Sequence, residues 1–191
     1  MGRVSTVLQI FLLLVITGWS CKKSQTETPA IRISGIALTN SFGASIGYFG
    51  DQDQDWTLLN SLPPAEMAVL DFTSSHKLDN TTEAGIQSPI KAYPNPMAAS
   101  QAYNTLVSDS VIVRIAVVNE YLDVLKTASF KAKGPLTFTL DYSNRTEFPI
   151  GTLLRVYYSY SATGKPHYKV GYGDIMICNS LSQNGSTGTC K

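Results

Sequence analysis

The 191 residues carry 15 Lys and Arg against 14 Asp and Glu, a formal net charge of +1. Residues 1–20 hold one basic residue, Arg3, and no acidic one, so the rest of the chain has 14 of each sign and is neutral. A neutral chain without basic runs disfavours nucleic acid as a partner. About 170 residues after position 20 are enough for one domain with a stable core, or for two small ones.

The first two dozen residues have the pattern of an export signal. Arg3 precedes an apolar run from Val7 to Val15, and Gly18-Trp19-Ser20-Cys21-Lys22-Lys23 follows. The run is shorter than the roughly 20 apolar residues of a bilayer span, and no later segment approaches that length. This stretch resembles the signal peptide of bacterial lipoproteins, which implies lipidation of Cys21 and cleavage just before it. The alternatives are an ordinary secretory signal, cut near Gly18 or Ser20, and a segment that stays uncleaved as an anchor.

This pattern also sets the expected domain boundaries. Ser24 to Thr28 is polar and without apolar periodicity, as in a flexible linker. We expect a signal peptide over residues 1–20 and a lipidated tether over 21–29. A β-sandwich domain should follow over 30–178, with a sub-boundary near 76–92, and a Ser/Gly-rich tail over 179–191. In the lipoproteins that this segment resembles, an Asp directly after the cysteine is a signal for retention in the inner membrane. Lys22 stands there instead, so the resemblance implies the outer membrane and leaves the periplasmic or surface face open.

Beyond the tether, apolar residues alternate with a period of two, and no segment shows a sustained helical face with caps. Val111 to Val118 is apolar on both faces, which predicts a central strand. Residues 136–142 and 154–160 predict strands with one wet face, and Tyr157 lies on that face. Further strands are expected at 31–36, 67–72, 121–127 and 168–178.

Turn signals separate these runs at short spacings, as between antiparallel strands. They are Lys133-Gly134-Pro135, Ser143-Asn144, Pro149-Ile150-Gly151 and the hairpin tip from Ala162 to Lys165. The alternation and the spacing together predict an all-β fold, an antiparallel β-sandwich.

The second half of the chain carries a further resemblance. Tyr93-Pro94-Asn95-Pro96 precedes the Val/Ile strand, Gly134 precedes the Phe138 strand, and Pro149-Ile150-Gly151 precedes a Tyr-rich strand. Residues from about 92 to 178 thus resemble the immunoglobulin-like C-terminal sorting domain of the type IX secretion system. The resemblance implies an immunoglobulin-like architecture and, as an alternative function, recognition by a secretion system.

Gly43-Ala44-Ser45-Ile46-Gly47 forms a GxSxG pattern, and Asp141 and His167 follow in the order used by α/β-hydrolases. Ser45 would be the nucleophile, His167 the base and Asp141 its orienting partner. A nucleophile elbow needs a strand before the serine and a helix after it, within βα alternation that this chain lacks. We therefore predict a bend and no catalytic residue, with a serine esterase or glycoside hydrolase as a lesser alternative.

Asp51, Asp53 and Asp55 place carboxylates at alternate positions, a spacing that suits a Ca²⁺ loop. The pattern is partial, because an EF-hand loop would have Gly at Trp56 and Glu at Leu62. A structural Ca²⁺ ion is thus the one cofactor that the sequence suggests, and a solvated acidic turn is the alternative.

Aromatic side chains could stack on sugar rings, and the candidates are Trp56, Tyr157 and Tyr172. Packing in the core or between strands is the alternative, because Tyr is a good strand former.

If Cys21 is lipidated, Cys178 and Cys190 remain, and an even pair in an exported protein predicts a disulfide. Two unpaired thiols, or pairing with another chain, are the alternatives. Neither cysteine belongs to a CxxC pair, so no zinc pattern exists.

The sequence therefore predicts a membrane-anchored exported lipoprotein that acts as a non-catalytic binding or assembly module in the cell envelope. Its partners would be membrane lipid, through acylated Cys21, and an envelope protein or glycan. Exposed sheet edges are where a partner strand could be added.

Overall fold

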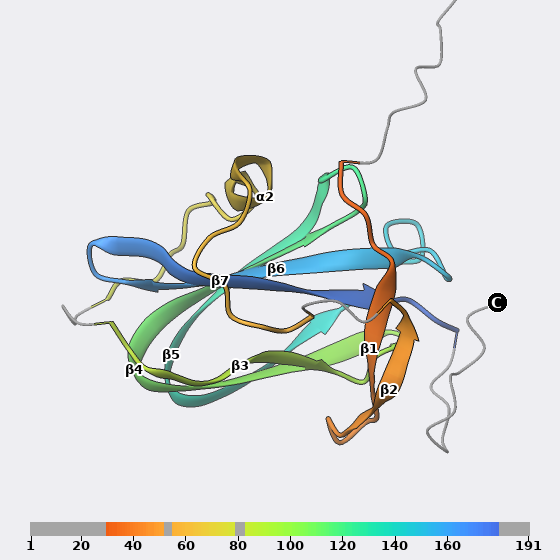
Figure 1. Cartoon of the computed structure of the whole chain (residues 1–191), viewed down its shortest axis with the longest axis horizontal. Helices are drawn as coiled ribbons and strands as arrows, with labels where there is room; N and C mark the ends of the chain where they lie inside the picture. The colour runs from red at the N-terminus through yellow and green to blue at the C-terminus, as the bar shows by residue number, and fades with distance from the viewer. Residues whose placement is uncertain (1–29, 52–54, 79–82, 180–191) are drawn as a thin grey trace, which may run out of the picture.

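The computed structural model describes residues 30–51, 55–78 and 83–179, and it is built mainly of β-strands (Figure 1). The elements in chain order are β1 (Gly35–Thr39), β2 (Ser45–Gly50), α2 (Pro64–Ala68), β3 (Ile86–Tyr93), β4 (Ser100–Val118), β5 (Val124–Asp141), β6 (Leu153–Ala162) and β7 (Lys165–Met176). All paired strands run antiparallel. The prediction of an all-β, antiparallel fold is confirmed.

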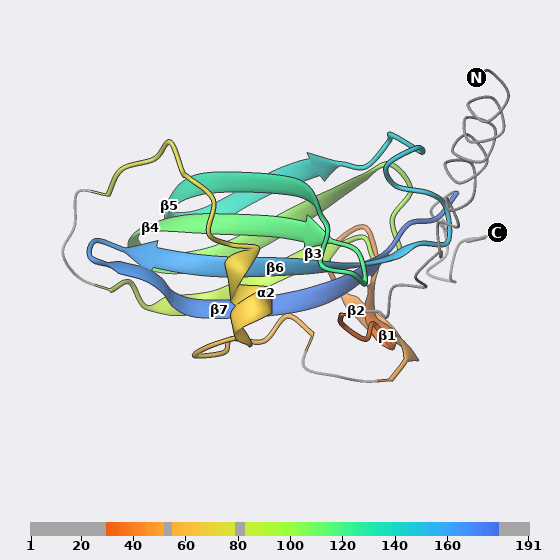
Figure 2. The same ribbon diagram turned by 90° about the horizontal axis from the view of Figure 1, so that it is seen from above.

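The strands form two sheets. β1 and β2 make a two-stranded sheet, and the other five strands make a larger one in the order β3, β4, β6, β7, with β5 along the second edge of β4. The first half of β4 pairs with β3 and its second half with β6. Figures 1 and 2 show β6 and β7 running side by side along the length of the domain, with β1 and β2 at one end.

The long strands β4 and β5 bend in the middle. Their register shifts between Val107 and Val111, opposite Gly134 and Ala132. Gly134 has a φ of +78°, which suits glycine at a bulge. The turn predicted at Lys133-Gly134-Pro135 is therefore wrong, because β5 continues through it. Pro135 is tolerated because β5 is an edge strand whose outer backbone needs no donor.

The bend folds the larger sheet into two arms around the main core. This core joins Tyr103 and Phe138 from one arm to Val113, Tyr158 and Ile175 from the other. Every residue from Val111 to Val118 except Arg114 is buried, which confirms the predicted central strand.

A second, smaller core lies on the outer face of β4, β6 and β7. Residues 59–72 cross this face, where Leu62 and Leu70 pack against Tyr157 and Val170. The strand predicted at 67–72 is wrong, because α2 begins at Pro64 and ends at Ala68. Proline in the first turn and an acidic Glu66 after it favour a helix start over an extended strand.

The remaining local predictions overlap the observed elements in part, and β3 and the first half of β4 lie where no strand was predicted. The tip from Ala162 to Lys165 closes the β6–β7 hairpin, and the turns at Ser143-Asn144 and Pro149-Ile150-Gly151 lie between β5 and β6. The strand expected at 31–36 begins only at Gly35. Within the described ranges, no helix is long and apolar enough to cross a bilayer.

Candidate functional site

The β1–β2 hairpin carries most of the large apolar side chains that the described part of the chain exposes. Phe42 is 90% exposed, Phe49 53%, Tyr48 48% and Ile46 43%. Residues 33–50 contain no charged side chain at all. An exposed apolar cluster of this kind is typical of an interaction surface.

The tip of the hairpin is a well-formed turn. The Asn40 Oδ1 accepts hydrogen bonds from the N–H groups of Phe42 (2.9 Å) and Ala44 (3.0 Å). The Gly43 N–H donates to the Asn40 carbonyl at 3.0 Å, and Gly43 has a φ of +79°. The side chain of Phe42 is thus held out into solvent by a turn with its own hydrogen bonds.

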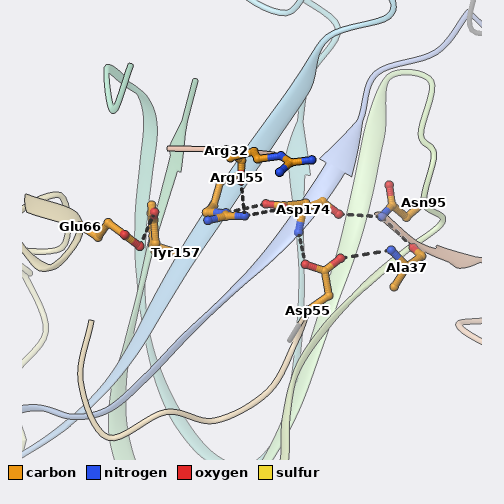
Figure 3. Close-up of polar contacts among 8 residues, drawn as sticks. All are labelled: Arg32, Ala37, Asp55, Glu66, Asn95, Arg155, Tyr157 and Asp174. Carbon is orange, nitrogen blue, oxygen red and sulfur yellow. Dashed lines mark hydrogen bonds and ion pairs between the residues drawn. The ribbon is translucent and has the colours of Figure 1, made fainter. Parts of the chain in front are cut away.

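Asn95 fastens this hairpin to the larger sheet (Figure 3). Its Nδ2 donates to the carbonyls of Ala37 and Asp174, both at 2.9 Å, and its Oδ1 accepts from the Met176 N–H at 3.2 Å. Its backbone exchanges two more hydrogen bonds with Thr39, at 2.9 and 3.1 Å. Asn95 is fully buried. The Asn of the Tyr-Pro-Asn-Pro sequence therefore joins β1 to β7.

Asp55 also connects β1 to β7. Its Oδ2 accepts from the Ala37 N–H at 3.1 Å, and its Oδ1 accepts from the Asp174 N–H at 3.0 Å (Figure 3). Asp51, in contrast, is exposed and lies 3.6 Å from the Arg32 guanidinium. Asp53 lies outside the described residues. Within the described part of the chain no group of three or more metal-ligating side chains occurs. Both Asp55 oxygens already bind backbone, and the calcium site stays a prediction.

A buried ion pair lies beside these contacts. The Arg155 Nε and Nη2 donate to the two oxygens of Asp174, each at 2.7 Å, and Nη2 also donates to the Arg32 carbonyl. The guanidinium lies 4.2 Å from the centre of the Tyr172 ring. Burial alone would lower the pKa of Arg155, but the hydrogen bonds and the charge attraction to Asp174 raise this pKa by a larger amount. The net shift is upward. This pair thus fixes β6 to β7 and the segment before β1.

The candidate sugar-binding aromatics are largely enclosed. Trp56 and Tyr157 are buried, and Trp56 stacks against Tyr158 with ring centres 6.4 Å apart. The Tyr157 hydroxyl donates to the Glu66 Oε2 at 2.7 Å (Figure 3). The expected wet-face position of Tyr157 is wrong, because residues 59–72 cover that face of the sheet. Tyr172 is partly exposed but lies under Arg155.

The candidate hydrolase residues lie on separate elements. Ser45 begins β2 in the exposed hairpin, Asp141 ends β5 and bonds to Ser143, and His167 lies on β7. His167 instead contacts Ser159 (Nδ1 to Oγ, 2.8 Å) and Asp71 (Nε2 to Oδ1, 3.2 Å).

This second Ser, His and Asp set was not predicted, and its chemistry differs from that of a hydrolase. Ser159 is fully buried, so its hydroxyl is closed to a substrate. Serine contacts Nδ1 and the carboxylate contacts Nε2, the reverse of the usual triad. Burial, and then the charge of Arg114, lower the pKa of His167. The set acts as a hydrogen-bonded link between residue 71 and the sheet.

The cysteine predictions fall partly outside the described residues. Cys178 is buried after β7, and its N–H donates to the Met97 carbonyl at 2.7 Å. Cys190 and Cys21 both lie beyond the described ranges, so the disulfide and the lipidation stay predictions.

Comparisons with family models, curated proteins and solved structures find no match to this chain. The assignment of the candidate site therefore comes from the geometry of the hairpin alone. The residues that sequence reasoning missed are Phe42, Ile46, Tyr48 and Phe49. Their signal was the uncharged run around the Asn40-Ser41-Phe42-Gly43 turn.

Proposed function

We propose that this chain is an exported lipoprotein of the bacterial cell envelope, anchored by lipid on Cys21, that acts as a non-catalytic binding module through its β1–β2 hairpin. The observation that carries the proposal is the 90% exposure of Phe42 on a structured turn. Burying a Phe side chain contributes roughly 1.5–3 kcal/mol, which this position leaves unused in the single chain. A partner that covers Phe42 would gain that free energy.

The position of the hairpin supports a partner that binds away from the tether. The N–H groups of Ala30 and Ile31 donate to the Glu120 carbonyl, so the chain joins the domain at the turn between β4 and β5. Figure 1 shows this point and the hairpin tip at opposite ends of β1. The tether would therefore attach at one end of β1 and Phe42 would meet its partner at the other.

The architecture supports a scaffold role for the rest of the domain. The two arms of the larger sheet pack their inner faces around the main core, and we propose that this arrangement is an immunoglobulin-like sandwich. The buried contacts of Asn95, Asp55 and Asp174 hold the hairpin on this scaffold. The separation of Ser45, Asp141 and His167 favours binding over the esterase alternative.

Photocrosslinking tests this proposal. A photoreactive phenylalanine at position 42 of the full chain should give a discrete protein adduct in native membranes. The matched control is position 124, because Val124 is also exposed (47%) but lies at the turn between β4 and β5. Equal labelling from both positions, or none from position 42, would contradict the proposed contact surface.

A further inference from the structure

We infer that the outer edge of β2 binds the same edge of a second copy of this chain, with the two β2 strands antiparallel. The product would be a four-stranded sheet with the order β1, β2, β2, β1. This inference rests on the proposed function, because it names a partner for one part of the same hairpin.

The backbone of β2 provides the first argument. Among the described residues β2 pairs only with β1, so its other edge presents backbone donors and acceptors to solvent. Proteins usually protect such edges with charged side chains, proline or a bulge. β2 has no charge and no proline, and its one irregularity leaves Ile46 unpaired near the turn. From Gly47 to Gly50 the strand pairs with β1 without a register shift, and its two end glycines have φ of +133° and +80°. The other edge of this stretch remains open for pairing.

The side chains of this stretch are complementary to themselves. Tyr48 and Phe49 are half exposed on opposite faces, and a glycine flanks this pair on each side, Gly47 before it and Gly50 after it. If Tyr48 lies on the twofold axis, it faces Tyr48 of the second copy, and each Phe49 faces a Gly47. Nothing lies within 4 Å of the place where a Gly47 side chain would be. The Phe49 ring of the second copy can cover this open position, and aromatic cross-strand pairs stabilise sheets.

The charges are compatible with the same pairing. Arg32 and Asp51 flank the uncharged run and form an exposed pair at 3.6 Å. With Tyr48 on the axis, Asp51 of one copy lies opposite Ser45 of the other. No like charges then face each other across the strands, an arrangement that would otherwise oppose pairing.

The length of chain before the domain allows both copies to share one membrane. The twofold axis places the two Ala30 residues at opposite ends of the new sheet. The eight residues between Cys21 and Ala30 span up to about 27 Å when extended. Both anchors can therefore reach one bilayer when the paired strands lie along its surface. The two Phe42 tips remain at the ends of the sheet, where another protein can bind them.

Cysteine crosslinking in native membranes tests the pairing with the full chain. Tyr48→Cys should give a disulfide-linked dimer on mild oxidation, because directly opposite residues have Cβ atoms about 4.5–5.5 Å apart. Val124→Cys is the matched control, with nearly the same exposure but no place in the pairing. The unsubstituted chain gives the background from its own cysteines. Adding Phe49→Lys to Tyr48→Cys should lower the dimer yield severalfold, whereas adding Val124→Lys should not.

Three outcomes overturn the inference. The first is a Tyr48→Cys dimer yield no higher than the background or the Val124→Cys control, and the second is a yield that Phe49→Lys leaves unchanged. The third is slow hydrogen exchange at residues 47–50 at every protein concentration, because the chain itself would then cover the outer edge of β2. A protein adduct from position 42 without any Tyr48→Cys dimer would leave the proposed function standing. A dimer without a position 42 adduct would support the pairing alone.

Discussion

The side chain of Asn95 should be a major source of the stability of the hairpin on the sheet. Asn95→Ala removes three buried or partly buried hydrogen bonds, to the Ala37 and Asp174 carbonyls and from the Met176 N–H. At about 1 kcal/mol for each bond, and with the backbone groups left unpaired, the free energy of unfolding should fall by roughly 3–4 kcal/mol. The loss should appear first in β1, which these bonds attach to β7.

Urea unfolding measures the total loss, and hydrogen exchange locates it. The amides of Ala37 and Thr39 should exchange faster in Asn95→Ala, because the small sheet detaches before the larger one. Asn60→Ala is the control, since Asn60 is exposed and bonds to the exposed Lys169 amine, and it should cost less than 0.5 kcal/mol. A loss below 1 kcal/mol for Asn95→Ala, or faster exchange throughout β4 and β6, would refute the reasoning.

Three further predictions concern the ion pair, His167 and Phe42. Asp174→Ala should lower the free energy of unfolding by about 3–5 kcal/mol, because it leaves the Arg155 charge buried without its partner. In the same urea assay, the double variant Arg155→Met/Asp174→Leu should recover part of the lost stability. An equal loss in both variants would contradict this prediction. Because folding lowers the pKa of His167, the folded state binds its proton less readily than the unfolded state. The contribution of His167 to stability is thus complete above its ordinary pKa of about 6.5 and is lost as pH falls below it. His167→Asn, which suits the φ of +54°, should flatten this part of the stability profile, and an unchanged profile would exclude His167 as its source. Phe42→Ser should change the free energy of unfolding by less than 0.5 kcal/mol yet weaken partner binding at the tip, and a clear loss of stability would show that Phe42 serves the fold instead.

The sequence predicts the strands well where burial is decided locally. The patterns at 111–118 and 154–160 located the second half of β4 and most of β6, and the double apolar face of Val111 to Val118 correctly indicated a central strand. Gly134-Pro135 was misread because a glycine at positive φ serves a bulge as well as a turn. Residues 67–72 were misread because their apolar positions suit a strand or a short helix, and packing against the sheet selects between the two.

The site depends on contacts that are distant in sequence. Asn95 and Asp174 are 79 positions apart, and no local pattern indicates that they meet. Tyr157 seemed exposed because its own strand alternates, but a covering segment some 90 residues earlier buries it. The exposed hairpin, in contrast, had a local signal in its lack of charge. Exposed apolar residues without charges among them are a warning that a partner covers the segment.

The intact mass of the protein extracted from native membranes tests the central claim most directly. The proposal of an anchored module predicts a chain that begins at Cys21, ends at Lys191 and carries a diacylglyceryl or triacyl increment. Reduction should add two hydrogens if Cys178 and Cys190 are bridged. A chain without the acyl increment, or one cut near its C-terminus, would contradict the anchored module and favour the sorting-domain alternative.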